Sequence, residues 1–304
     1  MKKLTIEEVV ELLFEKDKIS EPLGYKRKRW GKKNEFYLLR TSEKNIVLKH
    51  SLKGYGADEF HAMDILYNEG FPVPRPIHFI GEYEIIEGED WAYGDVPRKV
   101  GWLAYEYVEG KTLDNSMKEE LLFDAMKLLK YLHDYPKHKK EEPFIPNFQQ
   151  VEIDRIEFYL GRLKTRGDLN DEEFEKIRNF VEPYKTMEID YRIIHGDYRP
   201  NNLIVADPLI MIDFEGFSEG ADPRKDVGTF LAETKWAYDI RKIQIDLEKI
   251  YRIYFPKPNR DDIRIVQDFM IKRFLVKMTY NSAHIKIGKE KVMSIVTHPG
   301  QLII

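Results

Sequence analysis

Two short apolar runs stand close together in the stretch IIHGDYRPNNLIVADPLIMIDFEG, which extends from Ile193 to Gly216. The runs LIV and LIMID have the length of buried strands, and the Ala-Asp-Pro between them is typical of a turn. They are the single interruption in a part of the chain where apolar residues otherwise recur at helical spacing. The chain must therefore place one β-hairpin inside a mainly helical part of its fold.

The order of the patterns along the chain predicts two parts. Before Gly110, a helix with a capping-box start at Thr5 precedes two strands, a second helix and a strand-rich stretch that ends in WLAYEYVEG. After Gly110, helical patterns dominate. We expect an α+β chain with a small sheet-bearing domain, residues 1–107, and a larger helical domain, residues 108–304, that carries the hairpin. The expected strands are 36–40 and 46–50, and the expected helices are 58–67, 116–134, about 151–185, 224–255 and 261–287.

Composition excludes several classes of protein. The chain has 304 residues, 34% of them charged, and no cysteine. It therefore has no disulfide, no thiolate nucleophile and no cysteine-ligated zinc, and a reducing cytoplasm is the expected location. The net charge of −4 indicates no particular partner, and no apolar run approaches the roughly 18 residues that span a bilayer. We expect no membrane partner, and the oligomeric state stays open.

Three polar residues flank the predicted strands of the hairpin: Asp197, Asn202 and Asp213. Asn202 begins one strand and Asp213 ends the next, so the two ends meet in an antiparallel hairpin. Magnesium prefers carboxylate and amide oxygens, and these two side chains can share one ion. Asp197 lies five residues before Asn202, where it can act as the base for a substrate hydroxyl. Each residue alone also suits an ordinary turn, and only the combined spacing favours a site.

The segment HGDYRPNN, residues 195–202, resembles the catalytic loop of the aminoglycoside phosphotransferase and choline kinase-like family. That family typically shows HGD with an asparagine five residues after the aspartate. Asp213-Phe-Glu is similar to the metal-binding Asp-Phe-Gly of protein kinases. The segment 222–226, DPRKD, resembles the family's Asp-Pro-x-x-Asp, whose second aspartate holds the backbone of the catalytic loop. The resemblance implies a two-lobed protein kinase-like fold with a small antiparallel-sheet lobe and a larger, mainly helical lobe.

The same resemblance assigns nucleotide-binding residues to the first part of the chain. Lys49 resembles the third-strand lysine that contacts the α- and β-phosphates of the nucleotide, and Glu59 resembles the helix glutamate that pairs with it. YEYVEG, residues 105–110, resembles the hinge, where the carbonyl of Glu106 and the amide of Val108 would hold the purine. Lys49 alone would suggest an exposed strand lysine, but the motifs follow one another in the family's order from residue 25 to 235.

A basic run precedes the first of these motifs. Residues 26–33, KRKRWGKK, contain six basic side chains in eight positions. The run stands where the family has its phosphate-covering hairpin, and Lys33 is expected to contact the nucleotide. It lacks the GxGxxG pattern, which counts against an orthodox protein kinase. An RNA-binding surface needs interleaved aromatic residues, and Trp30 is the only one in this run, so we do not expect a nucleic-acid partner.

The resemblance implies a phosphotransferase that moves the γ-phosphoryl group of ATP or GTP to a hydroxyl of a small molecule. Asp197 would orient and deprotonate the hydroxyl, and Arg199 would stabilise the transferred group. Asn202 and Asp213 would hold Mg²⁺. One alternative is a kinase of RNA or protein, which needs a docking surface near the basic run. The other is a nucleotide-binding module without turnover, which normally lacks the base or a metal ligand.

Three further carboxylates follow the metal-binding aspartate within ten residues: Glu215, Glu219 and Asp222. If they wall the acceptor pocket, they repel anions and attract ammonium groups. This pattern predicts an acceptor that is neutral or bears an amine. The alternative is that these side chains face water or cap the helix that begins near Asp222.

Overall fold

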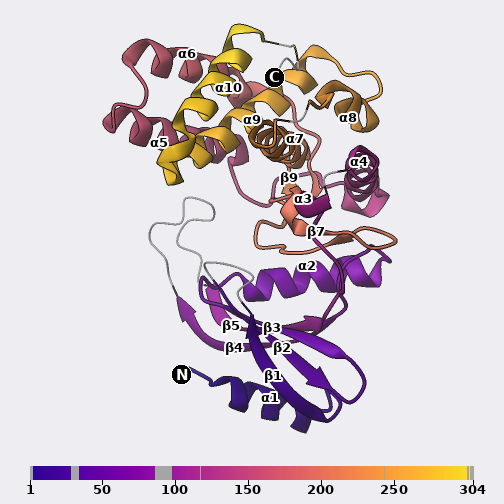
Figure 1. Ribbon diagram of the computed structural model, residues 1–304. Helices are drawn as coiled ribbons and strands as arrows, with labels where there is room; N and C mark the ends of the chain where they lie inside the picture. The colour runs from indigo at the N-terminus through magenta and orange to yellow at the C-terminus, as the bar shows by residue number, and fades with distance from the viewer. Residues whose placement is uncertain are drawn as a thin grey trace. The chain divides into compact units, whose positions relative to one another are not determined.

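The computed structural model describes residues 3–28, 34–85, 98–116, 118–242, 244–299 and 301. The chain divides into two compact units (Figure 1). The first consists of Met1–Thr112 and Asn202–Phe217, and the second consists of Leu113–Asn201 and Ser218–Ile304. In the part of the chain that is described, no helix combines the length and the apolar character that a membrane crossing requires.

The first unit is built on an antiparallel sheet with the strand order β1-β2-β3-β5-β4. Its helices α1 and α2 lie on opposite faces of this sheet (Figure 1). Side chains alternate between the faces, so Ile46 and Leu48 pack in one cluster with Val9 and Leu13 of α1, while Lys49 points to the other face. The elements are α1 (Ile6–Glu15), β1 (Pro22–Lys28), β2 (Glu35–Thr41), β3 (Asn45–Ser51), α2 (Gly56–Asn68), β4 (Pro76–Ile85) and β5 (Arg98–Glu106).

The predicted hairpin exists, but each of its strands has only two paired residues. β7 (Leu203–Ile204) pairs with β8 (Ile210–Met211) in antiparallel register. Backbone hydrogen bonds join it to the first unit: the Val205 N–H donates to the Lys111 carbonyl at 2.8 Å, and the Met211 N–H donates to the Pro72 carbonyl at 2.9 Å. The hairpin is therefore part of the first compact unit, whereas the sequence assigned it to the second domain.

The second unit is mainly helical. It contains α3 (Leu113–Ser116), α4 (Glu119–Asp134), α5 (Phe148–Thr165), α6 (Asp171–Val181), α7 (Arg224–Ile240), α8 (Leu247–Tyr254), α9 (Arg260–Tyr280) and α10 (Ile285–Thr297). Two short strands, β6 (Arg192–Ile194) and β9 (Ser218–Ala221), pair with each other. Helices α7 and α9 approach closely at Gly228, where an added Cβ would lie 2.6 Å from the Cβ of Phe269. This close packing brings side chains of α7 and α9 together beside the catalytic loop.

Most of the expected elements are present, and the differences concern where helices end and two short strands. The capping box at Thr5 is confirmed, because its side chain accepts the Glu8 N–H and the Glu8 side chain accepts the Thr5 N–H. The expected helices 151–185, 224–255 and 261–287 are each interrupted, the last of them between Tyr280 and Ile285, where α10 begins. Two of the new helices begin where Asn170 and Asp246 accept N–H groups of the next turn. Strands β6 and β9 were missed, because three or four residues are too short to show an alternating pattern.

Candidate active site

The Lys49 ammonium lies among three carboxylates in the first unit. Its Nζ is 2.7 Å from Glu59 Oε2, 2.9 Å from Asp213 Oδ1 and 2.8 Å from Glu215 Oε1. The lysine side chain is 1% exposed. Burial alone would lower the pKa of Lys49, but the three carboxylates outweigh burial and raise this pKa well above its ordinary value. Lys49 is therefore held as a cation in a fixed place.

Glu59 lies in the first turn of α2, on the face of the sheet toward which Lys49 points. It is the residue that the resemblance paired with this lysine. Burial raises the pKa of Glu59 to about 7, although the ammonium of Lys49 opposes this shift. The nearby carboxylates of Asp213 and Glu215 also favour a proton on Glu59. Three carboxylates around one ammonium leave an excess of negative charge at this point.

Asp213 and Asn202 occupy the two ends of the hairpin, as their positions in the sequence suggested. The Ile212 N–H donates to the Asn202 carbonyl at 3.0 Å, so the two segments lie side by side. Asp213 has a left-handed backbone with φ 67°, which is uncommon outside glycine and more frequent for Asp and Asn than for other residues. Such backbone conformations gather at functional sites.

The oxygen donors around Asp213 fit a magnesium ion. Carboxylate oxygens of Glu59, Asp213 and Glu215 lie within 4.8 Å of one another. Magnesium takes such hard donors, and a carboxylate that pairs with a lysine through one oxygen keeps further acceptor positions. Glu215 is an oxygen donor that the sequence did not propose as a ligand. Its proximity to Lys49 depends on the fold of the hairpin, which no local pattern specifies.

The expected purine-binding segment follows β5. The Glu106 N–H donates to the Arg75 carbonyl and the Tyr107 N–H donates to the Asn45 carbonyl, both at 3.0 Å. These bonds fix the end of β5 within the first unit. The role of the Glu106 carbonyl and the Val108 amide in holding a purine stays a prediction.

Lys33, also expected at the nucleotide, lies outside the described residues. The next residue, Asn34, is described, and its side-chain amide donates to the Glu215 carboxylate. Its side-chain oxygen accepts the Leu52 N–H at 3.3 Å. Asn34 thus connects the end of β3 and the carboxylates around Lys49.

In the second unit, Asp226 of α7 holds the backbone of the catalytic loop. Its Oδ2 accepts the His195 N–H at 2.7 Å, and its Oδ1 accepts the Gly196 N–H at 2.8 Å. Burial would raise the pKa of Asp226, but its hydrogen bond with His133 and the contacts with His195 lower it. Gly196 has φ 82°, a conformation that favours glycine and accounts for this residue in the HGD motif. The structural role expected of Asp226 is confirmed.

Asp197 is the next residue in this loop, and two arginines contact its carboxylate. Arg199 Nε lies 2.9 Å from Oδ2, and Arg273 NH1 lies 3.5 Å from Oδ1. The Asp197 side chain is 28% exposed, so it is not sealed from solvent. Arg273 belongs to α9 and is held by Glu233 of α7. Sequence reasoning missed Arg273, because a charged residue within a regular helical pattern normally indicates a solvent-facing position.

A small cavity lies beside Asp197 within the second unit. Its volume is about 70 Å³. Side chains that line it include Asp197, Lys225, Phe269, Lys272, Arg273 and Val276. The cavity is thus a mainly cationic space with an apolar wall from α9.

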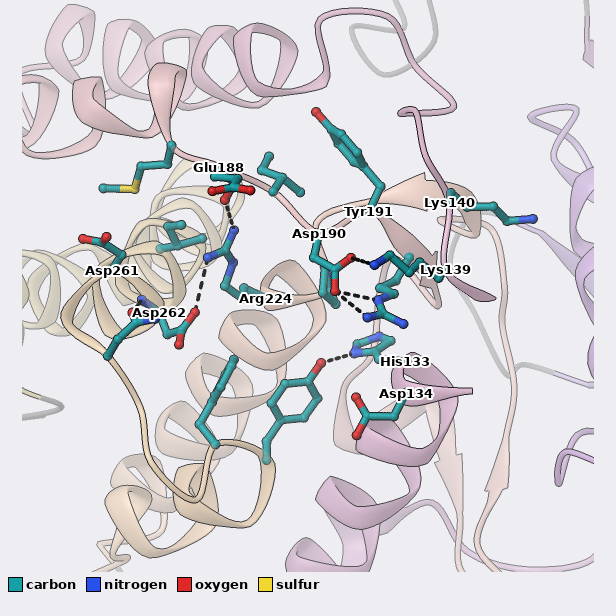
Figure 2. Close-up of a pocket in the computed structure, with 18 of the residues that line it drawn as sticks. His133, Asp134, Lys139, Lys140, Glu188, Asp190, Tyr191, Arg224, Asp261 and Asp262 are labelled. Carbon is teal, nitrogen blue, oxygen red and sulfur yellow. Dashed lines mark hydrogen bonds and ion pairs between the residues drawn. The ribbon is translucent and has the colours of Figure 1, made fainter. Parts of the chain in front are cut away.

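A larger hollow of about 1060 Å³ lies elsewhere in the second unit (Figure 2). Several of its charged side chains pair with one another: Arg224 contacts Asp262 at 3.3 Å, and Lys139 contacts Asp190 at 3.8 Å. His133 at its wall bonds to the Tyr254 hydroxyl at 2.6 Å. None of the predicted site residues that the structure describes lines this hollow, so its size does not make it the better candidate for the chemistry.

The chain matches the phosphotransferase enzyme family over residues 25–248, about three quarters of its length. It belongs to this family. No curated protein matches the chain.

Solved structures resemble this phosphotransferase over nearly its whole length. A choline kinase from Cryptosporidium parvum Iowa II is 14% identical with a TM-score of 0.59, and the match covers 95% of this chain and 96% of that one. A thermostable aminoglycoside phosphotransferase variant, in complex with ADP and hygromycin B, is 12% identical with a TM-score of 0.64, and the match covers 97% and 99% of the two chains. An amicoumacin kinase in complex with AMP-PNP and Ca²⁺ is 12% identical with a TM-score of 0.62, covering 99% and 98%. The protein kinase-like α+β fold expected from the sequence is confirmed.

The structure of the phosphotransferase removes the basis for the expected acidic wall. Glu215 contacts Lys49, as described above, and Glu219 contacts Lys140 at 3.2 Å. Asp222 is fully buried, where it accepts hydrogen bonds from Arg224 Nε at 2.9 Å and from the Tyr184 hydroxyl at 3.2 Å. Neighbouring positions in the sequence therefore point to different partners, and these three carboxylates do not form one surface.

Proposed function

We propose that this phosphotransferase moves the γ-phosphoryl group of a nucleoside triphosphate to a hydroxyl group of a small molecule. The observation that carries the proposal is the buried Lys49 ammonium, held 2.7 Å from Glu59 and 2.9 Å from Asp213. A buried cation fixed beside a partly exposed carboxylate is the arrangement that anchors a nucleotide phosphate and its metal ion. The solved relatives in complex with ADP or AMP-PNP support the same assignment.

The nucleotide-binding roles follow from the first unit. Lys49, positioned by Glu59, would bind the α- and β-phosphates, and Lys33 would add a further contact to them. The Glu106 carbonyl and the Val108 amide would hold the purine of ATP or GTP. Asn202 and Asp213 would hold Mg²⁺, which when bound neutralises charge on the phosphate oxygens.

The acceptor step belongs to the catalytic loop. The acceptor oxygen forms a bond to the γ-phosphorus while the bond from this phosphorus to the β–γ bridging oxygen breaks. The acceptor's proton passes to Asp197, and the nucleoside diphosphate leaves. Arg199 would stabilise charge on the transferred group. Because Asp226 fixes the loop backbone, Asp197 is already in position before the acceptor arrives.

Acceptor-dependent release of ADP tests the proposal. The protein is incubated with ATP or GTP, Mg²⁺ and a panel of hydroxyl compounds that includes sugars, amino sugars and sugar acids. We expect at least one class of acceptor to raise diphosphate release above the acceptor-free rate, and Asp197→Asn to abolish this increase. A protein that binds the nucleotide but shows no acceptor-dependent release with any class would instead be a nucleotide-binding module.

A further inference from the structure

Glu152 of α5 gathers three cations in the second unit. Its carboxylate is fully buried and contacts Arg155, Lys225 at 3.3 Å and Lys272. Burial would raise the pKa of Glu152, but the three cations outweigh burial and hold this pKa far below its ordinary value. The single negative charge of Glu152 thus holds three cations in place, and this cluster has an excess of two positive charges.

The neighbouring ion pairs add to this excess. Asp197 contacts Arg199 and Arg273, and Glu233 contacts Arg273 and Lys277. Among the residues that the structure describes, this group contains six cations and three carboxylates: Arg155, Arg199, Lys225, Lys272, Arg273 and Lys277 against Glu152, Asp197 and Glu233. Each carboxylate is already shared by two or three cations. The group therefore has a surplus of positive charge next to the proposed base.

Lys225, Lys272 and Arg273 also line the small cavity beside Asp197. The cavity volume of about 70 Å³ is well above the roughly 10–15 Å³ that a cavity needs to hold one water molecule. It has room for a group of several atoms, such as a carboxylate or a phosphate. Removing cations from water without full compensation costs free energy. Burial and the neighbouring cations Arg155 and Lys225 lower the pKa of Lys272 to about 7, so a bound anion would favour its charged form.

We propose that the acceptor carries an anionic group, a carboxylate or a phosphate, which binds to Lys225 and Lys272 in this cavity. The inference rests on the proposed function, because it takes Asp197 as the base. Lys49, which is assigned to the nucleotide phosphates, and the metal donors belong to the first unit. Arg199 is assigned to the transferred phosphoryl group. Lys225 and Lys272 are left for the acceptor. An acceptor with an amine in this position would meet like charges, which is the reverse of the expectation from the sequence.

The first experiment compares acceptors that share one sugar framework. Binding is measured by calorimetry and turnover by ADP release, with gluconate, glucose 6-phosphate, glucose and glucosamine. We expect gluconate or glucose 6-phosphate to bind at least tenfold more tightly than glucose, and glucosamine to bind most weakly. A preference for gluconate over glucose 6-phosphate, or the reverse, distinguishes the carboxylate from the phosphate.

The second experiment uses Lys225→Met and Lys272→Met. Each variant leaves two cations on Glu152, so the buried carboxylate keeps partners, and thermal melting verifies the fold. We expect each variant to raise the KM for the anionic acceptor tenfold or more and to leave the KM for MgATP unchanged. Lys176→Met is the matched control, because Lys176 is exposed and pairs with Glu172 on the helix surface.

We expect Glu152→Gln to change the affinity for the anionic acceptors in the direction opposite to the two lysine variants. Loss of this carboxylate raises the positive potential of the cavity, so we expect tighter binding of gluconate and glucose 6-phosphate. A purely structural role for the cluster would instead weaken binding in all three variants, and that result overturns the inference.

The outcomes of these experiments distinguish the proposal of an anionic acceptor from the proposed phosphotransfer itself. If glucose or glucosamine is the better acceptor and its KM is unchanged in Lys272→Met, the anionic acceptor is refuted and the phosphotransfer stands. If neither anion binds, the inference is refuted as well. If anions bind through Lys272 but no acceptor of any class releases ADP, the cavity remains an anion site and the proposed function is wrong.

Discussion

Replacing Asp226 by asparagine is expected to loosen the catalytic loop by a predictable amount. The carboxylate accepts two backbone N–H groups, from His195 at 2.7 Å and from Gly196 at 2.8 Å. An asparagine side chain offers its oxygen to one of these donors and turns its own NH₂ group, also a donor, toward the other. A hydrogen bond to a charged group contributes about 1.5–3 kcal/mol, and a buried donor without a partner costs about 1–3 kcal/mol. We expect a local loss of about 3 kcal/mol.

Amide hydrogen exchange measures this loss at the residues concerned. Since about 1.4 kcal/mol corresponds to a factor of ten, the His195 and Gly196 amides should exchange about 10²-fold faster in Asp226→Asn. The acceptor-dependent kcat should also fall, because Asp197 follows these two residues. Asp124→Asn is the control, since Asp124 forms only an exposed surface pair with Lys127 and such pairs contribute little. Exchange of both loop amides within threefold of wild type would refute the assigned role of Asp226.

Three further predictions concern the first unit. Asp213→Ala should weaken MgATP binding at least tenfold and leave magnesium-free ATP binding almost unchanged in calorimetry; equal losses in both would exclude a metal role. Lys49→Met should raise the KM for MgATP at least tenfold, with little change in the KM for the acceptor, in steady-state kinetics. A raised KM for the acceptor with an unchanged KM for MgATP would contradict the role of Lys49 in binding the nucleotide phosphates. Because the pKa of Glu59 is raised from 4.5 to about 7, the folded protein binds a proton that the unfolded chain has released. The free energy of unfolding should therefore fall as pH rises through this window and become level above it. Urea unfolding at several pH values should show that the free energy of unfolding falls less with pH in Glu59→Gln than in wild type. The same pH dependence in both proteins would count against the raised pKa of Glu59.

The local parts of the site could be read from the sequence. Residues 195–202, the hairpin ends at Asn202 and Asp213, and Asp226 lie within a short segment where spacing restricts geometry. Lys49 could be placed only because the motifs around it follow the order of the family that the chain resembles, since a lysine in a strand would by itself suggest an exposed position. These motifs are readable because each depends on neighbours within a few residues, or on one strand or helix.

The electrostatic environment of Asp197 could not be read in the same way. Lys272 and Arg273 come from α9 and Glu152 from α5, and only the packing of helices brings them to one place. The acidic residues after Asp213 illustrate the opposite error. Glu219 and Asp222 are close in sequence, but their partners Lys140 and Arg224 direct them away from a common surface. Proximity in the sequence is therefore no guide to the charge of the acceptor pocket, for which the cations around Asp197 support the opposite sign that we propose.

The central claim is that Asp197 acts on the acceptor hydroxyl while other residues bind the nucleotide. The most direct test measures MgATP affinity and acceptor-dependent turnover in Asp197→Asn. We expect the Kd for MgATP to stay within about twofold of wild type and kcat to fall by roughly 10²–10⁴, the usual contribution of a general base. A variant that keeps more than about half of its turnover, or that loses MgATP binding in parallel with turnover, would contradict this account.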